Sequence, residues 1–548
     1  MPQPDSPSDP GDRRDAPRFA AFTPPLPPQA LLDRYGARVL RPSESLVLPG
    51  QQVRPTAYVA DRLIAPRPES LAEGGAIWRA AKDLGVQLQY EELREARGFA
   101  PLQRATSVQL TPTGPQPADA WAVLQRARQL VAEDGDGTGD GTGGPAGFSA
   151  GPAQLGAVSL DHILYATEVG ANPYNSPNPY NSPNPYNSPN PYGAWSPIAQ
   201  YGRPGFGGTQ PVRLLLPVPE RLPLDGRRPV VAVLDTVVHT EHPWLDGVVL
   251  QGLPDPDTGV TMGLADLPAA TLADPLDGVL DPFAAHGTFI AGIVRQVCPD
   301  ADVLSLPVVH PDGVIVESEL LSALDQLYRY LRAQQAATGT RAVDVLNLSM
   351  GYYHETPGDA AFDSVLYRSL RALAEAGVAV VTSAGNDATA TPMYPAAFTA
   401  GLTGTGAGGS GTGDGGTPAV PITGVGALNP NGTVAMFSNT TPSASAWEPG
   451  AVLISTMPPT FDAGLLPTSR WQDPSGRERE TPDPDDFSCG FGVGSGTSYA
   501  APVFAAKVAR YLLAAAPGGL PATEEDADAV KRAAAAVESA LATGGSPG

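Results

Sequence analysis

Strand-length aliphatic runs alternate with helix-length segments through the C-terminal half of the chain, and this alternation most limits the possible folds. Residues 228–235 (RPVVAVLD) form an almost unbroken β-branched and aliphatic run, which fits a strand buried on both faces. Further strands are predicted at 302–309, 343–348, 378–382 and 422–427, and helices at 286–297, 318–335, 361–376 and 497–515. Such alternation is typical of a parallel sheet with helices on both faces, so the predicted fold class is α/β.

Residues with catalytic chemistry fall at the ends of these elements. Asp235 closes the first strand, His286 opens the helix at 286–297, and Asn386 follows the strand at 378–382. Ser498 stands at the start of the last helix, where free backbone N–H groups and the helix dipole favour the negative charge of an oxyanion. Singly, each has a plainer interpretation as a cap or turn residue. Together, in this order and with two of them at strand ends, where sites of parallel sheets lie, they are hard to attribute to chance.

The motifs around these residues resemble those of the subtilisin-like serine peptidases, from residue 229 to residue 516. In family order they are VAVLDT with HPWL after it, HGTFIAG, NLSMG, SAGN and GTSYAAP. The resemblance implies a subtilisin-like fold in which Asp235, His286 and Ser498 form a catalytic triad and Asn386 supplies the oxyanion hole. It also implies a peptide groove bordered by Ser349, Met350, Gly351, Ser383, Ala384 and Gly385.

These residue types suit endopeptidase chemistry. A serine hydroxyl is a poor nucleophile near neutral pH and needs a base, and the imidazole of His286 titrates in that range. Asp235 would hold the ring in the right tautomer and stabilise the imidazolium. The side-chain amide of Asn386 and the backbone N–H of Ser498 would bind the carbonyl oxygen as it gains charge. The substrate would lie along the groove as an added strand.

One departure from the family pattern favours the first of two alternative functions. The family usually has glycine two residues after the aspartate, and this chain has Val237, which disfavours positive φ. The turn after Asp235 is therefore expected to take a different path. A peptide-binding pseudopeptidase is one alternative, and a dedicated processing peptidase or transpeptidase acting on one partner is the other. His239 and His242 are interpreted as parts of a structural turn.

An α+β module is predicted upstream, at 53–166. Strands are expected at 56–65, 86–93, 105–111 and 157–165, with helices at 70–84 and 118–131. The order βαββαβ is the split, ferredoxin-like pattern. Pro-domains of the subtilisin-like peptidases have this arrangement, so the module is interpreted as a pro-domain that holds the enzyme as a zymogen. An unrelated small α+β module is the alternative.

The remaining segments are predicted to be irregular. The Pro-rich residues 1–52 are expected to be disordered, and the segment 167–225 contains the hexapeptide NPYNSP three times in succession. These repeats are either an extended spacer or a sequence that a partner or the enzyme reads. The catalytic domain is expected at 226–517, with long loops at 251–281, 401–418 and 457–487. A separate C-terminal helix and tail follow at 518–548.

Composition limits the partners. Lys and Arg number 34 against 57 Asp and Glu, a net charge of −23 that argues against nucleic acid or anionic lipid and leaves a protein or peptide substrate as the expected partner. The chemistry requires no cofactor. Many relatives bind calcium, but the acidic groups Asp255 with Asp257, and Asp483 with Asp485 and Asp486, are too generic to predict a metal site.

Cysteine usage and hydropathy bear on the compartment. Cys298 and Cys489 are either one disulfide or two unpaired thiols, and neither has the spacing of a zinc ligand. The N-terminus lacks the apolar core of a signal peptide, and no run of about 18 apolar residues occurs. The expected location is the cytoplasm, with export by a non-standard route as the alternative.

Overall fold

The structure is a computed structural model of the 548-residue chain. It describes residues 29–48, 51–66, 71–90, 106–135, 158–166, 199–205, 207–264, 280–281, 283–356, 365–399 and 417–545. The NPYNSP repeats and most of the Gly-rich segment 401–418 lie outside these residues. None of the helices in the described part of the chain is both long and apolar enough to span a membrane.

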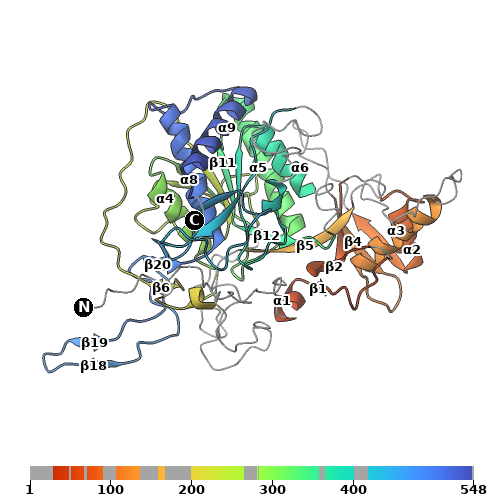
Figure 1. The fold of residues 1–548 in the computed structure, drawn as a ribbon, viewed down its shortest axis with the longest axis horizontal. Coiled ribbons are helices and arrows are strands. Elements are labelled where there is room, and N and C mark those ends of the chain that lie inside the picture. Colours follow the sequence, from red (N-terminus) through yellow and green to blue (C-terminus); the bar gives the residue numbers. More distant parts are fainter. Residues whose placement is uncertain are drawn as a thin grey trace, which may run out of the picture.

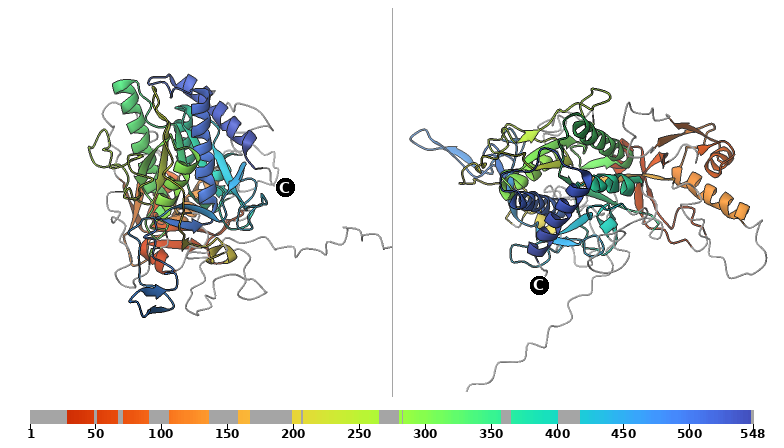
Figure 2. Two further views of the ribbon diagram at one scale, coloured as in Figure 1. Left: turned by 90° about the vertical axis from the view of Figure 1, so that its left-hand side faces the viewer. Right: turned by 90° about the horizontal axis from the view of Figure 1, so that it is seen from above.

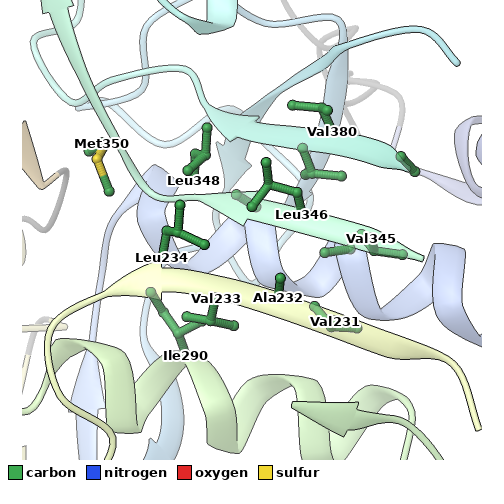
Figure 3. Close-up of a cluster of buried hydrophobic side chains, with 14 of the residues drawn as sticks. Val231, Ala232, Val233, Leu234, Ile290, Val345, Leu346, Leu348, Met350 and Val380 are labelled. Carbon is green, nitrogen blue, oxygen red and sulfur yellow. The ribbon is translucent and has the colours of Figure 1, made fainter. Parts of the chain in front are cut away.

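A seven-stranded sheet forms the centre of the C-terminal part, in the order β16-β15-β13-β11-β7-β9-β8. Its strands are β7 (Val230–Asp235), β8 (Val249–Leu250), β9 (Asp302–Pro307), β11 (Val345–Leu348), β13 (Ala379–Ser383), β15 (Thr423–Leu428) and β16 (Ala446–Pro449). All neighbouring pairs run parallel. Every residue of β7 is buried, as its aliphatic sequence predicts. Figure 3 shows side chains of β7 and β11 packed together, with Ile290 against β7.

Helices cover both faces of this sheet, as expected for the α/β class (Figures 1 and 2). Helices α4 (His286–Val297) and α8 (Thr497–Ala515) pack on one another on one face, and α5 (Glu317–Thr338) and α6 (Val365–Glu375) pack together on the other. Helices α4 and α8 begin at the residues predicted from the sequence.

The boundary expected at residue 517 is wrong. Helix α9 (Asp526–Thr543) packs against α8, and its buried residues Val530, Val537 and Ala540 belong to the same core as the central sheet. One face of the helix consists of small apolar residues. Burying this face against the catalytic core is more favourable than exposing it to water. The C-terminal helix is therefore part of that core.

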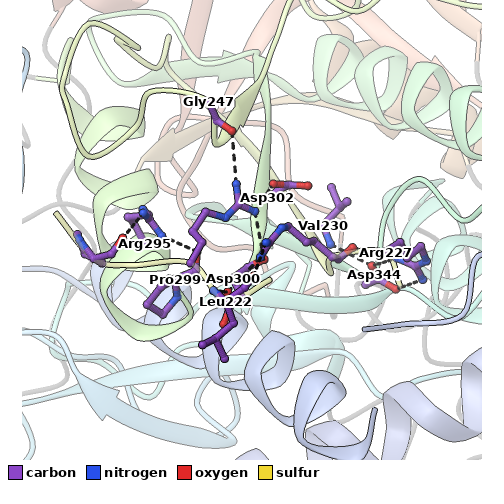
Figure 4. A network of polar contacts seen from close by, with 12 residues as sticks. Leu222, Arg227, Val230, Gly247, Arg295, Pro299, Asp300, Asp302 and Asp344 are labelled. Carbon is purple, nitrogen blue, oxygen red and sulfur yellow. Dashed lines mark hydrogen bonds and ion pairs between the residues drawn. The ribbon is translucent and has the colours of Figure 1, made fainter. Parts of the chain in front are cut away.

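The amino ends of the strands are held by ion pairs (Figure 4). Arg227 contacts Asp344 at 2.6 Å, and Arg228 contacts Asp300 at 3.0 Å. Asp344 also accepts a hydrogen bond from the backbone N–H of Val230, at 3.0 Å. These charges lie at the opposite end of β7 from Asp235, so the carboxyl ends of the strands remain for the candidate site.

The N-terminal module has the expected element order. It comprises β2 (Thr56–Ala65), α2 (Ala76–Asp83), β3 (Val86–Tyr90), β4 (Thr106–Pro112), α3 (Ala120–Gly135) and β5 (Ser159–Ala166). The strands form an antiparallel sheet in the order β5-β2-β4-β3, and the two helices pack on one another over a separate hydrophobic core. The module lies to one side of the C-terminal part in Figure 1.

Strand β5 joins the module to the C-terminal part. It pairs antiparallel with β10 (Val314–Val316) and with β12 (Met350–Tyr353), and β12 also pairs with β14 (Met393–Tyr394). One sheet therefore crosses from the module into the catalytic part of the chain.

The expected disorder of residues 1–52 is wrong for 29–48. This segment forms α1 (Gln29–Arg34) and β1 (Ala37–Leu40), and β1 pairs antiparallel with the first half of β2. Leu32 and Leu40 are buried in the process. A six-residue helix and a four-residue strand carry too little periodicity to be recognised, and their order comes from the tertiary contact.

The segment before the catalytic part is also partly ordered. Within the expected linker 167–225, η3 (Ala199–Gly202) and β6 (Gln210–Pro211) are formed, and β6 pairs with β20 (Phe491–Gly494). Strand β20 also pairs with β17 (Leu453–Thr456). The loop expected at 457–487 carries a hairpin, β18 (Arg470–Gln472) and β19 (Glu478–Glu480), which extends away from the body (Figure 1).

Candidate active site

Asp235 and His286 meet at the carboxyl end of β7. Asp235 is the last residue of the strand, His286 is the first residue of α4, and both side chains are completely buried. Nδ1 of His286 lies 2.7 Å from Oδ1 of Asp235, which also accepts a hydrogen bond from the N–H of Thr236 at 2.8 Å. With its proton on Nδ1, the imidazole donates to the carboxylate and presents a basic Nε2.

Ser498 is the second residue of α8 and lies beside this pair. The ring of its neighbour Tyr499 is 5.3 Å from the ring of His286, and the backbone carbonyl of Ser498 accepts the hydroxyl hydrogen of Ser349 at 2.8 Å. Oγ of Ser498 and Nε2 of His286 do not hydrogen-bond to one another here. In serine hydrolases this contact is often long until substrate binds.

Asn386 is tied to the start of the same helix. Its Oδ1 accepts hydrogen bonds from both the N–H and the hydroxyl of Thr497, each at 2.9 Å. The NH₂ end of the amide is therefore turned away from Thr497. Gly385 adds a hydrogen bond from its N–H to the Thr497 hydroxyl, at 3.0 Å. Thr497 thus joins the segment after β13 to the residue that precedes Ser498.

Two supporting residues were missed by the sequence analysis, Thr497 and Asn439. Oδ1 of Asn439 accepts the N–H groups of Asp387 and Thr389, both at 3.1 Å, and its Nδ2 donates to the carbonyl of Ala384 at 2.9 Å. This one amide spans the segment that carries Asn386. Thr497 is at least inside the GTSYAAP motif, whereas nothing near Asn439 in the sequence indicates the contact.

A glycine is required beside Asn439. Gly385 has φ of +102°, and a Cβ there would lie 2.3 Å from Nδ2 of Asn439 and from Sδ of Met393. Any larger residue would push the Asn386 segment away from α8. A partly buried tyrosine supports the same segment, since the hydroxyl of Tyr353 donates to Asp387 at 2.6 Å. Burial, opposed by this hydrogen bond, raises the pKa of Asp387 to about 6.

The six residues expected to border the groove lie in two segments at the carboxyl ends of β11 and β13. Ser349 links β11 to β12, and Met350 and Gly351 open β12. Ser383 ends β13, and Ala384 and Gly385 follow it. The edge of β12, along which the substrate was expected to add as a strand, is already paired with β5. Met350 pairs with Ala166, and Gly351 pairs with Tyr165.

Val237 does not disturb the carboxylate. Among the residues that the structure describes, those with positive φ other than glycine are Ala388 and Val452, so the turn after Asp235 needs no glycine at 237. The carbonyl of Asp235 accepts the N–H groups of Val308 and Val309, at 2.8 and 3.1 Å. These bonds hold the end of β7 in place and weaken the case for a pseudopeptidase that rested on this position.

The two nearby histidines have structural contacts, as interpreted from the sequence. Nδ1 of His242 accepts the N–H of Trp244 at 3.0 Å, and its ring packs edge-on against Phe491. The ring of His239 packs against Phe461, 5.2 Å between centroids. Burial lowers the pKa of both histidines.

Both cysteines are free thiols, which decides between the two alternatives for Cys298 and Cys489. Asp255 and Asp257 are both paired with Arg329, at 2.8 and 3.1 Å, and Asp255 is buried. Within the described residues, two groups bring His or acidic side chains close enough to share a cation: His162 with His354 and Glu355, and Asp462 with Asp483 and Asp485.

Comparison with known proteins identifies the family of the chain. One similar solved structure is a cold-adapted subtilisin-like serine proteinase, with 17% identity and a TM-score of 0.34; the match covers 57% of this chain and 85% of that one. Another is fervidolysin from Fervidobacterium pennivorans, described as a keratinolytic enzyme related to subtilisin, with 17% identity and a TM-score of 0.41; the match covers 86% of this chain and 56% of that one. The sequence model of the Subtilase family matches residues 226–544, which include α9. This match covers more than half of the chain and confirms the resemblance drawn from the motifs: the chain belongs to the subtilase family.

Proposed function

We propose that this protein is a serine endopeptidase in which Ser498 is the nucleophile, His286 the general base and Asp235 its positioning partner. Membership of the subtilase family supports a serine-type peptidase. The observation that carries the assignment of roles is the buried pair of His286 and Asp235, with 2.7 Å between Nδ1 and Oδ1, beside the helix start that bears Ser498.

In this mechanism Oγ of Ser498 attacks the carbonyl carbon of the scissile bond while Nε2 of His286 removes its proton. The negative charge of Asp235 stabilises the imidazolium. The oxygen of the tetrahedral intermediate is bound by the N–H of Ser498, in the first turn of α8, and by the amide of Asn386. His286 then protonates the leaving amine, and the acyl-serine ester is hydrolysed by a water molecule that the same imidazole activates.

The N-terminal module acts in this proposal as an intramolecular inhibitor. A peptide substrate would add as a strand beside Ser349, Met350 and Gly351. Strand β5 already pairs with two of these residues, so substrate and module compete for one strand edge. The peptidase is therefore made as a zymogen and becomes active when β5 leaves.

A buried ion cluster strengthens this contact. His162 of β5 lies with Nδ1 2.6 Å from Glu317 and Nε2 2.9 Å from Glu355, and all three side chains are at most 2% exposed. Glu317 opens α5 and Glu355 follows β12, so one side chain of the module bridges two segments of the catalytic part. Breaking such a contact is costly, which suits a module that must stay bound until processing.

Product analysis tests the proposal. The full chain and its Ser498→Ala variant are first incubated to allow processing and release of the module. Each is then mixed with an unstructured protein, or with a peptide plus an amine nucleophile, and the products are weighed by mass spectrometry. Internal cleavage by the parent and none by Ser498→Ala is expected. Ser488→Ala is the matched control, because Ser488 is exposed in the same segment and should leave cleavage unchanged.

Other outcomes separate the alternatives. Products that carry the amine in place of water would identify a transpeptidase, and cleavage of only one natural partner would identify a dedicated processing enzyme. Equal cleavage by the parent and by Ser498→Ala would overturn the role given to the serine. A parent that stays inactive after removal of the module would be a peptide-binding pseudopeptidase.

A further inference from the structure

Three carboxylates meet at the base of the hairpin that precedes the candidate nucleophile. Asp462 lies on the outgoing limb of this loop, and Asp483 and Asp485 lie on the returning limb, with strands β18 and β19 between them (Figure 1). Each contributes an oxygen, and the three oxygens lie within 4.8 Å of one another. We call residues 463–482 the arm. The carboxylates therefore gather where the arm leaves and rejoins the body.

Within the described ranges, the three carboxylates have no cation in direct contact, although the charge of Arg470 acts on Asp483 from a distance. Among the described residues, no Lys, Arg or His forms an ion pair with Asp462, Asp483 or Asp485. Two of the three arginines of the arm are paired with other acids: Arg470 with Glu478 and Glu480, at 3.5 and 2.8 Å, and Arg479 with Asp473 at 3.4 Å. Like charges this close repel one another unless a proton or a cation lies between them.

Asp485 gives the second, independent sign of a ligand. Its side chain is 7% exposed, and Oδ2 accepts the N–H of Leu465 at 3.0 Å. Oδ1 is buried yet receives no hydrogen bond from any donor in the part of the chain that the structure describes. A buried carboxylate oxygen without a donor is strongly destabilising.

We propose that Asp462, Asp483 and Asp485 form a calcium site that fixes the base of the arm. The available side-chain ligands are all carboxylate oxygens, which hard cations prefer over softer metals. Calcium accepts irregular geometry from loop residues and takes water or backbone carbonyls for its remaining positions, whereas magnesium demands a near-ideal octahedron. A divalent cation here offsets the mutual repulsion and gives the buried Oδ1 of Asp485 its missing partner.

The site is linked to the region around Asp235 through one aromatic residue. Next to Asp462, Phe461 is buried, and its carbonyl accepts the N–H of Phe487 at 2.7 Å, which ties the two limbs together. The ring of Phe461 packs on His239, which follows Asp235. Bound calcium therefore orders the arm and, through Phe461, the loop after β7 that carries His239. The proposal does not depend on the catalytic roles given above.

Calcium titration of the full chain tests the site. Ser498→Ala protein, which cannot digest itself, is stripped with EDTA and titrated with CaCl₂ by calorimetry, and its Tm is measured with EDTA and with calcium. One tight calcium site and a higher Tm with calcium are expected. Asp485→Asn and Asp462→Asn should each weaken binding by at least about tenfold, since calcium affinity follows the number of anionic ligands.

Asp486→Asn is the matched control. It removes the same charge from the adjacent residue, but the Asp486 side chain caps the N–H of Ser488 at 2.8 Å, a bond that asparagine keeps. This variant should bind calcium like the parent. Asp462 is exposed, so Asp462→Asn tests the site even where Asp485→Asn fails to fold.

Three results would overturn the proposal. A Tm that is equal in EDTA and in calcium would assign the cluster to carboxyl groups that share a proton. Calcium binding that Asp462→Asn and Asp485→Asn leave unchanged would place the ion elsewhere on the acidic surface. If magnesium binds as tightly as calcium, the site is not specific for calcium and the assignment of calcium is wrong.

Discussion

Replacing His162 with alanine is expected to loosen the N-terminal module from the catalytic part of the chain. The imidazole of His162, on β5 of the module, contacts two carboxylates of the catalytic part: Glu317 at 2.6 Å and Glu355 at 2.9 Å. Burial lowers the pKa of His162, but the hydrogen bonds to the two glutamates outweigh it and raise the pKa to about 10. The ring is therefore cationic at neutral pH, and its removal leaves two buried carboxylates without their shared partner.

The size of the effect follows from this shift. A rise in pKa from 6.5 to about 10 corresponds to roughly 5 kcal/mol, at about 1.4 kcal/mol per unit. Removing one partner from a buried ion pair costs about 3–5 kcal/mol. Since β5 is the strand that carries His162, this loss should weaken docking of the module by roughly 10²- to 10⁴-fold.

The pH dependence has a definite sign. The pKa of His162 is higher in the folded than in the unfolded chain, so its contribution is complete below about pH 6.5 and is lost as the pH rises towards about 10. Stability should fall by about 1.4 kcal/mol per pH unit in this window. The other ionisable groups described around the ring are Glu317, Glu355, His354 and Tyr352, whose ring stacks on that of His162, with Arg128 acting on Glu355.

Urea unfolding in a Ser498→Ala background measures the change, with limited proteolysis to report release of the module. His310→Ala is the control, because His310 is 29% exposed and 4.0 Å from Glu319, where a loss below about 1 kcal/mol is expected. The reasoning is refuted if His162→Ala unfolds within about 1 kcal/mol of its parent at pH 7, a change typical of a surface ion pair. It is equally refuted if the variant keeps the alkaline slope.

Three further substitutions probe the site and its supports. Asn386→Ala should lower kcat by roughly 10²–10³ with little change in KM, a magnitude measured on subtilisin itself and carried over from it. Gly292→Ala should destabilise the protein by about 1–3 kcal/mol in a thermal melt, because overpacking follows when a Cβ is placed 2.1 Å from Oγ1 of Thr456. Lys507→Met should cost about 3–5 kcal/mol in urea unfolding, because it leaves the completely buried carboxylate of Glu448 without its cation.

The glycine and lysine substitutions each have a control that matches their chemistry. Gly518→Ala places a Cβ where nothing lies within 4 Å, so its Tm should stay that of the parent. Lys531 is 77% exposed, and Lys531→Met should change stability by less than about 1 kcal/mol. If a control and its test variant behave alike, the corresponding contact does not have the role given to it. An Asn386→Ala enzyme with unchanged kcat would remove this amide from the oxyanion hole.

The catalytic strands and helices were predictable because their sequences are extreme. The run VVAVLD has no polar residue before its terminal aspartate, which leaves a fully buried parallel strand as its one stable place. Helices α4 and α8 begin at His286 and Thr497 as predicted, since a long apolar segment follows small residues at each start. The convergence of Asp235 with His286 then follows from the parallel sheet, whose strand ends share one edge.

The rest depends on contacts between distant segments. Strand β1 is ordered by pairing with β2, and α9 by burial against α8, and neither partner can be identified from local periodicity. Asn439 supports the Asn386 segment through three backbone groups, a role that appears only when the chain has folded. The acidic cluster at Asp485 was dismissed for the same reason, because burial of one oxygen is not visible in the sequence.

The most direct measurement is the site of covalent labelling by a fluorophosphonate, determined by peptide mapping of protein that has been incubated to allow processing. Phosphonylation of Ser498 is predicted, with labelling much slower in His286→Ala and unchanged in Ser488→Ala. A label on another residue, or an equal rate of labelling without the imidazole of His286, would contradict the proposed chemistry.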